Sequence, residues 1–417
     1  MTSTDLPATT EADQVITANG AGPDTPQAAG RSSGTADSTK RPGIAPAAVA
    51  GRSAMKDRWS APRSGPNDGL ERAVDRAFRV PMVALAVSLV VLVLGFMISV
   101  SVGASDLAFA QVVAGLIDRL PGVAVDSGLS VTEESILWQW RVPRAVLSAL
   151  VGAALAMSGA TFQGVFRNPL ADPYLLGVAA GAGLGATLAI VGGADFGWGP
   201  VHAVPMAAFA GALLAVVASA VLGFGTSRSA SSLLLAGVAV ASFLTAVQTF
   251  VMQRNTDLLA EVYSWILGRL GTFGWTEVTL LAPYVVVCGL VAIALSRHLD
   301  VMQLGDDEAS ALGVNVIVVR SVLVVAASLL AAAAVSVSGL IAFVGIIVPH
   351  FVRLAVGSSY RVVLPLSALG GAAFLVVADV GARTIAAGSE VPIGVVTAFF
   401  GAPFFALVLW TKRGALQ

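Results

Sequence analysis

Long apolar stretches follow one another from about residue 80 to the end of this 417-residue chain. Each is close to the length of helix that crosses the roughly 30 Å hydrocarbon core of a bilayer. Charged residues make up only 12% of the chain, about half the share that is typical of soluble domains. The sequence therefore predicts an all-α, polytopic membrane protein with about ten transmembrane helices. The expected spans are 80–103, 143–165, 175–193, 203–224, 233–252, 277–296, 317–337, 339–356, 363–386 and 392–411.

The N-terminal region lacks any such stretch and is rich in Ala, Gly, Ser, Thr, Pro and charged residues. Because this composition is typical of disorder, we expect a disordered cytoplasmic tail over residues 1–75 and one transmembrane domain over residues 76–417. Nine Lys and Arg against four Asp and Glu lie between Lys40 and Arg79, which favours a cytoplasmic N-terminus. An even number of helices then returns the C-terminus to the cytoplasm.

One short pattern occurs twice in the chain. Ser158-Gly159 is followed by Pro169, and Ser338-Gly339 is followed by Pro349 at the same offset. By our count of spans, the two copies belong to four-helix halves of opposite orientation, as in inverted-repeat transporters. Two such spacings can also arise by chance in a chain with 44 glycines, so the pattern is a weak indication of related halves.

Residues that could couple transport to an energy source are scarce. None of the three lysines lies in a G-x-x-x-x-G-K-[ST] phosphate loop, and the sequence has no metal-ligand cluster or nucleophile motif. We therefore expect no catalytic residue, no metal site and no cofactor in this chain, and no nucleic-acid partner. Asp379 and Glu390 lie near helix ends, whereas ion-coupled carriers usually place an acid in mid-helix. A secondary transporter or channel driven by an ion gradient is thus the less favoured alternative.

Five blocks resemble, in the same order, the permeases that import ferric siderophores, haem and cobalamin. The blocks are RVPRAVLSALVGAALAMSGATFQGVFRNPLADPYLLGVAAGAGLG (141–185), SSLLLAGVAVAS (231–242), LGDDEASALGVNV (304–316), GLIAFVGIIVPHFVRL (339–354) and ADVGARTIAAGSEVPIGVVTAFFGAPFF (378–405). The likeness covers about residues 80–413. On these motifs the chain is identified as a member of the FecCD/BtuC-like family, the large ten-helix permeases of type II ABC importers.

The resemblance implies an assembly. It predicts a homodimer of this chain in the bacterial cytoplasmic membrane, surrounded by lipid, with two ATP-binding cassette ATPase subunits on the cytoplasmic side. A substrate-binding protein would dock on the outer side. The ATPase subunits would use ATP and Mg²⁺, and this chain would have no enzymatic activity. A ferric siderophore is the favoured substrate, and haem and cobalamin remain alternatives that the sequence does not separate.

The resemblance also implies roles for three groups of residues. The segment between the sixth and seventh helices would seat in the ATPase and transmit its closure, although acids at a helix start also simply suit the helix dipole. We expect this segment to form two short helices joined at Gly313. Its residues are Leu304, Gly305, Asp306, Asp307, Glu308, Ala309, Leu312 and Gly313.

Three arginines would lie on the outer side and bind carboxylates of the binding protein, namely Arg141, Arg144 and Arg383. The alternative is that they anchor the helix ends to lipid headgroups. Cytoplasmic gate residues would come from two loops, the one after the second helix and the one before the fifth. The alternative for the first loop is a simple tight turn. The gate residues are Asn168, Leu170, Ala230 and Ser231.

Overall fold

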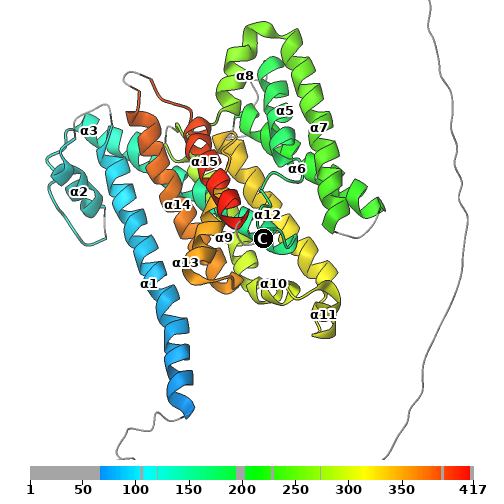
Figure 1. Ribbon diagram of the computed structural model, residues 1–417. Helices are drawn as coiled ribbons and strands as arrows, with labels where there is room; N and C mark the ends of the chain where they lie inside the picture. The colour runs from blue at the N-terminus through cyan, green and yellow to red at the C-terminus, as the bar shows by residue number, and fades with distance from the viewer. Residues whose placement is uncertain are drawn as a thin grey trace, which may run out of the picture. The chain divides into compact units, whose positions relative to one another are not determined.

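Figure 1 shows the fold in a computed structural model of the chain. The structure describes residues 66–417 except 104–106, 120, 194–201, 227–229, 273, 387–388 and 414–417. Helices are the only regular secondary structure among these described residues. Residues 1–65 of the expected tail lie outside them, and helix α1 already begins at Pro66.

The elements follow the predicted order. They are α1 (Pro66–Ser101), α2 (Phe109–Asp118), α3 (Val131–Ile136), the π-helical turn η1 (Leu137–Arg141), α4 (Val142–Val165), α5 (Val178–Val191), α6 (Ala203–Thr226), α7 (Ala230–Arg254), the short 3-10 turn η2 (Thr256–Leu258), α8 (Leu259–Ile266), α9 (Thr276–Ala294), α10 (Ser296–Met302), α11 (Asp306–Ala311), α12 (Val316–Ser338), α13 (Val344–Val356), α14 (Tyr360–Thr384) and α15 (Ile393–Arg413).

The ten predicted spans correspond to α1, α4, α5, α6, α7, α9, α12, α13, α14 and α15. By length and composition, seven helices in the described part of the chain can cross a membrane. Helices α5 and α13 and the segment Ile393–Ala406 of α15 are shorter apolar helices. Helix α5 has 14 residues and α13 has 13. At about 1.5 Å per residue, neither alone spans the roughly 30 Å core.

Non-helical backbone precedes both short helices. Residues 339–343 lead into α13, and the loop after α4 leads into α5. The Tyr174 hydroxyl in that loop donates to the Ile341 carbonyl at 2.8 Å and accepts from the Ile341 N–H at 3.2 Å. Irregular backbone at membrane depth is tolerated only where other parts of the protein satisfy its polar groups. Tyr174 does this between the two halves of the chain.

We take α4–α7 and α12–α15 as the two four-helix halves of the chain. The second predicted span of each, α5 or α13, is a short helix, which agrees with related halves. The repeated Ser-Gly-to-Pro spacing, however, does not mark equivalent positions. Ser158 and Gly159 are buried within α4, whereas Ser338 is the last residue of α12 and Gly339 is its C-cap. The similarity of the halves lies in their helix order rather than in this motif.

Helix α4 forms the centre of the bundle and is buried along almost its whole length. It packs along α14 and against α12, α13 and α9. Small residues make these crossings close: a Cβ on Gly152 would lie 2.1 Å from the Gly371 carbonyl oxygen, and one on Gly159 would lie 2.0 Å from that of Gly345. Glycine is required there because the two backbones touch, the usual way in which membrane helices associate.

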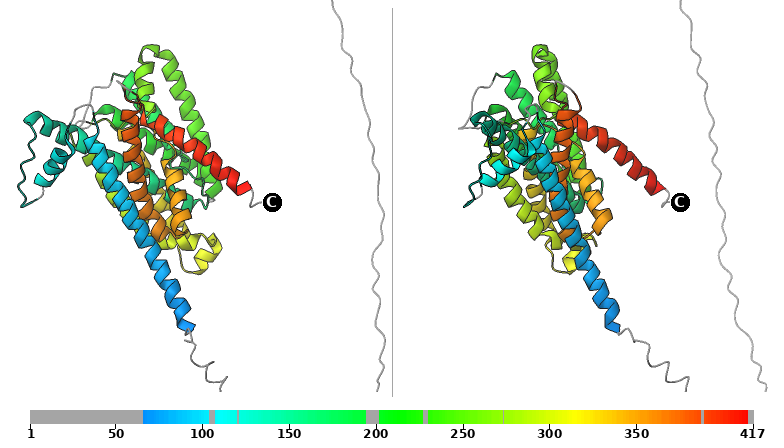
Figure 2. Two further views of the ribbon diagram at one scale, coloured as in Figure 1. Left: turned by 60° about the vertical axis from the view of Figure 1, so that its left-hand side comes forward. Right: turned by 90° about the vertical axis from the view of Figure 1, so that its left-hand side faces the viewer.

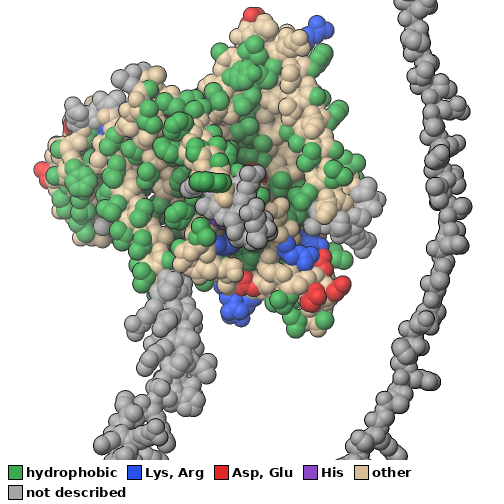
Figure 3. Space-filling view, in the orientation of Figure 1, with side chains coloured by type: hydrophobic (Ala, Val, Ile, Leu, Met, Phe, Trp, Pro, Cys, Tyr) green, Lys and Arg blue, Asp and Glu red, His purple; other side chains and the backbone are tan. Residues whose placement is uncertain are grey.

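The outside of the bundle has two different regions. In the space-filling view the flank is mostly hydrophobic, and acidic and basic side chains gather below it near α10 and α11 (Figure 3). Helix α15 leaves the bundle at an angle in both views of Figure 2. It carries exposed aromatic side chains, including Phe399, Phe400 and Trp410.

Candidate functional site

Charged side chains meet at two places in the bundle. We call the first the arginine end; it is formed where α1 and α14 end and α4 begins. We call the second the α11 end; it is formed where α4 ends and α12 and α14 begin. The predicted docking arginines lie at the first, and the predicted coupling segment lies at the second.

Arg141 is buried at the arginine end and is held by the chain itself. It closes the π-helical turn before α4, and its Nη1 donates to the carbonyls of Val100 at 2.9 Å and Ser101 at 2.8 Å. These carbonyls belong to the last turn of α1, whose acceptors have no partner within the helix. A cation there also suits the negative end of the helix dipole. Arg141 therefore caps α1.

Arg383 makes a second cap on the same helix. Its Nη2 donates to the Ser99 hydroxyl at 2.8 Å and the Ser99 carbonyl at 3.2 Å, and its Nη1 donates to the Val102 carbonyl at 3.1 Å. Its Nε lies 3.2 Å from a carboxylate oxygen of Asp379, one turn earlier on α14. Two of the three predicted docking arginines thus also fasten α1 to the bundle.

Arg144 lies between two carboxylates. Its Nη2 is 2.9 Å from Asp379, and its Nη1 and Nη2 are 2.8 and 3.0 Å from the two oxygens of Glu390. The hydrogen bonds and charge of Arg144 hold the pKa of the Glu390 carboxyl below its usual range. We flagged Asp379 and Glu390 as isolated acids near helix ends; the structure pairs both with the predicted docking arginines. Docking itself stays a prediction.

Replacing Arg141 by alanine is expected to lower the free energy of unfolding by about 2–4 kcal/mol, because two carbonyl acceptors of α1 lose their buried charged donor. The matched control is Arg119→Ala. Arg119 is exposed and meets Glu134 at 3.4 Å, so its loss should change stability by less than about 1 kcal/mol. Thermal unfolding of the detergent-solubilised chain measures both. Equal melting temperatures for the two variants would contradict the capping role.

At the α11 end, Asp306 joins three segments of the chain. Its carboxylate accepts from Arg167 Nη2 at 2.8 Å, just after α4, and from Arg320 Nη2 at 2.8 and 2.9 Å, on α12. The Arg320 side chain is buried, whereas Arg167 and Asp306 are partly exposed. Asp306 is the first residue of α11, so this charge cluster fixes the start of the predicted coupling helix.

The coupling segment contains one short helix rather than two joined at Gly313. Helix α11 spans Asp306–Ala311, and Gly313 lies in the turn that leads to α12. The other short helix is α10, and the break between them contains Gly305, whose φ is 140°. Both glycines have positive φ, which a residue with a side chain rarely adopts. Our expected joint was therefore wrong by about eight residues.

The surface of this segment combines apolar and acidic side chains. The side chains of Leu304 and Leu312 are exposed. Asp307 and Glu308 are exposed between them, whereas Ala309 is buried. Exposed leucines on a charged helix–turn unit are typical of a surface that a partner covers. This arrangement agrees with the predicted role, which no contact within the chain tests.

Helix α10 connects the segment to two long helices. The Asp300 carboxylate accepts from the Tyr360 N–H at 2.6 Å and the Ser359 hydroxyl at 2.8 Å, at the start of α14. Gln303 Nε2 donates to the Gly164 carbonyl at the end of α4 at 3.0 Å. The sequence analysis did not identify Asp300, Gln303 or Arg320, because their partners are distant in the chain.

The predicted gate residues lie in two turns. The Asn168 side chain accepts from the Leu170 N–H at 3.0 Å and stabilises a tight turn in which Leu170 is exposed. Ala230 begins α7, and Ser231 is exposed in its first turn. The tight turn that we considered as the alternative is therefore present, and gate lining stays a prediction.

Asp172 begins the next turn of this loop, and burial raises its pKa to about 6 despite a hydrogen bond from the Tyr174 N–H. Since this value lies above that of an unfolded chain, the folded state binds more protons, and stability falls as the pH rises from about 4 to 6. Replacing Asp172 by asparagine should therefore raise the free energy of unfolding at pH 7.5 by at most about 3 kcal/mol and leave it unchanged near pH 4. Melting temperatures across this pH range test the effect. A D172N curve parallel to the wild-type curve would contradict it.

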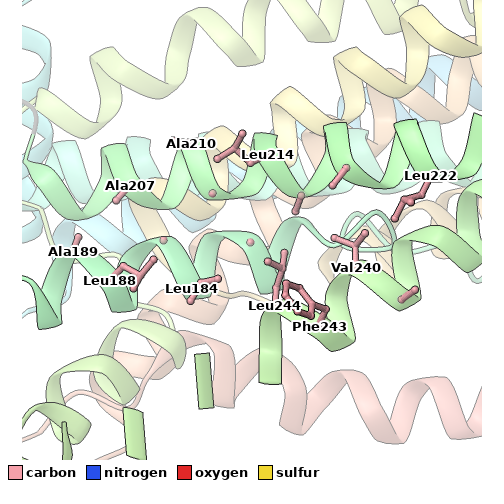
Figure 4. A pocket seen from close by; sticks show the side chains of 16 residues that line it. Leu184, Leu188, Ala189, Ala207, Ala210, Leu214, Leu222, Val240, Phe243 and Leu244 are labelled. Atoms are coloured by element: carbon pink, nitrogen blue, oxygen red, sulfur yellow. The ribbon is translucent and has the colours of Figure 1, made fainter. Parts of the chain in front are cut away.

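The two cavities with the largest volumes, about 870 and 800 Å³, are lined almost entirely by apolar side chains and glycine; Ser88 in the first is the exception. One of about 800 Å³ lies between α5, α6 and α7 and is lined by Gly, Ala, Leu, Val and Phe. In Figure 4 the labelled Leu184, Leu214, Phe243 and Leu244 side chains border this space. No group of three or more His, Cys, Asp or Glu that could hold a metal ion is found in the described part of the chain.

Known proteins are similar to this chain in sequence and in architecture. Residues 91–411 match the FecCD transport family. The chain is 43% identical over 283 residues to the uncharacterised ABC transporter permease YvrB of Bacillus subtilis, covering 66% of this chain and 78% of that protein. It is 42% identical over 284 residues to the cobalamin import permease BtuC of Halobacterium salinarum, covering 68% and 75%. It is 36% identical over 329 residues to the Fe(3+)-citrate import permease YfmE of Bacillus subtilis, covering 79% and 95%.

A solved structure agrees with the sequence matches. The chain superposes on a metal-chelate-type ABC transporter in an inward-facing conformation with a TM-score of 0.68 and 28% identity, covering 79% of this chain and 99% of that one. The family match covers most of the chain, from the last third of α1 to near the end of α15. This chain is therefore a membrane permease of the FecCD transport family.

Proposed function

We propose that this chain is the permease subunit of an ATP-driven importer that carries a metal chelate, a ferric siderophore first, across the bacterial cytoplasmic membrane. One observation carries the proposal: the apolar helix bundle has a group of charged residues at each end. One end bears α11, and the other bears Arg144. Relatives named for cobalamin and Fe(3+)-citrate import support the substrate class. Haem and cobalamin remain alternative substrates.

The α11 end faces the cytoplasm in this proposal, together with both chain termini. The basic residues that precede the first span support this orientation. The arginine end then faces outward, where a substrate-binding protein docks. Its guanidinium groups suit carboxylates of that protein, because such pairs are bidentate and steer association.

Two further kinds of partner complete the importer. A second copy of this chain would pair with it, and the exposed Leu235, Phe243 and Phe250 of α7 and Phe399 of α15 provide apolar surface for it. Two ATPase subunits would cover Leu304 and Leu312 and would bind the ATP and Mg²⁺. Asn168, Leu170, Ala230 and Ser231 would line the cytoplasmic gate.

Transport in proteoliposomes tests the proposal. The permease is reconstituted with the ATPase and the binding protein of the same importer, and uptake of a ferric siderophore, haem and cobalamin is measured in turn. Uptake of one of them is expected only with ATP, and it should stop when the phosphate-loop lysine of the ATPase is replaced. Uptake that persists without ATP and follows an imposed ion gradient would instead favour a secondary transporter.

A further inference from the structure

The two carboxylates on Arg144 occupy different environments. The Asp379 side chain is 1% exposed and also pairs with Arg383, so it is a fixed part of the bundle. The Glu390 side chain is 59% exposed and belongs to the loop between α14 and α15. Arg144 itself is 15% exposed. One side of the Arg144 guanidinium is thus held by the buried Asp379, and the other side is covered by the exposed Glu390.

A cavity of about 600 Å³ lies beside this pair. Its polar lining comes from Trp140, Arg141, Arg144, Thr272, Arg383 and Glu390. Three of these side chains are cations and one is an anion, and the buried Asp379 behind Arg144 and Arg383 adds a second negative charge. The cluster keeps one net positive charge, which favours an incoming carboxylate. The Glu390 carboxylate already provides one, with two hydrogen bonds of 2.8 and 3.0 Å to Arg144.

We propose that Glu390 is a built-in occupant of the docking site: its carboxylate covers Arg144 until a carboxylate of the binding protein displaces it. This inference rests on the proposed docking of a binding protein at the arginine end. Glu390 would then set how tightly the partner binds, because the partner must compete with it for the same guanidinium.

Exchanging Glu390 for a carboxylate of the partner costs little free energy. An ion pair with one exposed partner is worth little, since water solvates the released carboxylate. Asp379 keeps Arg144 in position throughout, so the guanidinium does not have to be ordered again when the partner arrives. Arg144 also keeps Glu390 ionised at neutral pH, so the competition is one of charge for charge.

The test compares Glu390→Gln with a matched control, Glu134→Gln. Glu134 is 53% exposed and pairs with Arg119, which we do not assign to docking. Both variants remove one exposed negative charge from an ion pair with arginine. The probe is the ligand-free binding protein of the same importer, and its binding to permease in nanodiscs is measured by interferometry at several salt concentrations. Melting temperatures confirm that both variants are folded.

E390Q is expected to bind the probe about three- to tenfold more tightly than wild type, mainly through faster association, with the difference shrinking at high salt. E134Q should bind like wild type. Equal affinity of E390Q and wild type would overturn the inference, and so would weaker binding, which would make Glu390 a contact of the partner. A wild-type permease that does not bind the probe at all would overturn the docking function as well, so the two failures are distinguishable.

Discussion

Replacing Gly159 by leucine is expected to abolish folding of the helix bundle. A Cβ at this position would lie 2.0 Å from the Gly345 carbonyl oxygen and 2.5 Å from the Gly345 Cα. Both atoms belong to backbone, so no side-chain rotation relieves the clash and α13 must move away from α4. Overpacking of this kind, at the most buried helix, should cost more than about 4 kcal/mol. The yield of monodisperse protein in size-exclusion chromatography and its melting temperature measure the loss.

Gly381→Ala is the matched control for this substitution. Gly381 is also helical, in α14, but the nearest atom to an added Cβ is a methyl carbon of Ile385 at 3.8 Å, an ordinary contact. Alanine is favoured over glycine in a helix by about 1 kcal/mol, so this variant should be at least as stable as wild type. A Gly159→Leu variant that melts with the wild type would show that α4 and α13 are not in backbone contact.

Replacing Asp306 by asparagine is expected to reduce transport per ATP hydrolysed by at least about tenfold. A tenfold change corresponds to about 1.4 kcal/mol, and breaking a charge cluster with a buried member costs more than that. Asparagine can accept a hydrogen bond from one arginine, but it cannot neutralise both Arg167 and Arg320. Helix α11 would then lose its charged connection to α4 and α12. The ratio of substrate uptake to ATP hydrolysis in proteoliposomes measures this coupling.

Asp307→Asn provides the control at the next position. Asp307 is exposed, and the described part of the chain shows no ion pair for it. If the coupling role depends on the connection to α4 and α12, Asp307→Asn should retain most of the wild-type ratio. If both variants lose coupling to the same extent, the negative charge of the segment matters rather than the cluster around Asp306.

The sequence alone was sufficient to predict the long helices, but not the short helices α2, α3, α8 and α10. Apolar stretches of membrane-spanning length mark α1, α4, α6, α7, α9, α12 and α14 directly, because composition and length decide whether a segment can cross a bilayer. The boundaries of α5 and α13 were less accurate. The residues that the predicted spans wrongly included, 175–177 and 339–343, are apolar too, and only the contact of Ile341 with Tyr174 shows how polar groups of this backbone are satisfied.

The charged sites were predicted as positions but not as networks. The sequence identified Arg144, Asp306, Asp379 and Glu390 one by one. The pairing of Arg144 with Asp379 and Glu390, and of Asp306 with Arg167 and Arg320, became visible only in the folded chain. Arg144 and Glu390 are 246 residues apart, and Arg167 and Asp306 are 139 apart. No local pattern records such a pairing, since it depends on how distant helices pack.

The succession of long apolar stretches determined by itself that this chain is a polytopic membrane protein, because burial of apolar residues in lipid is a local property of each segment. Family motifs then identified the chain as a permease. The tertiary structure decided what the charged residues do: Arg141 and Arg383 cap α1, Asp306 fastens α11, and Glu390 covers Arg144. These roles depend on distances between helix ends, which the packing of glycines at the α4 crossings determines.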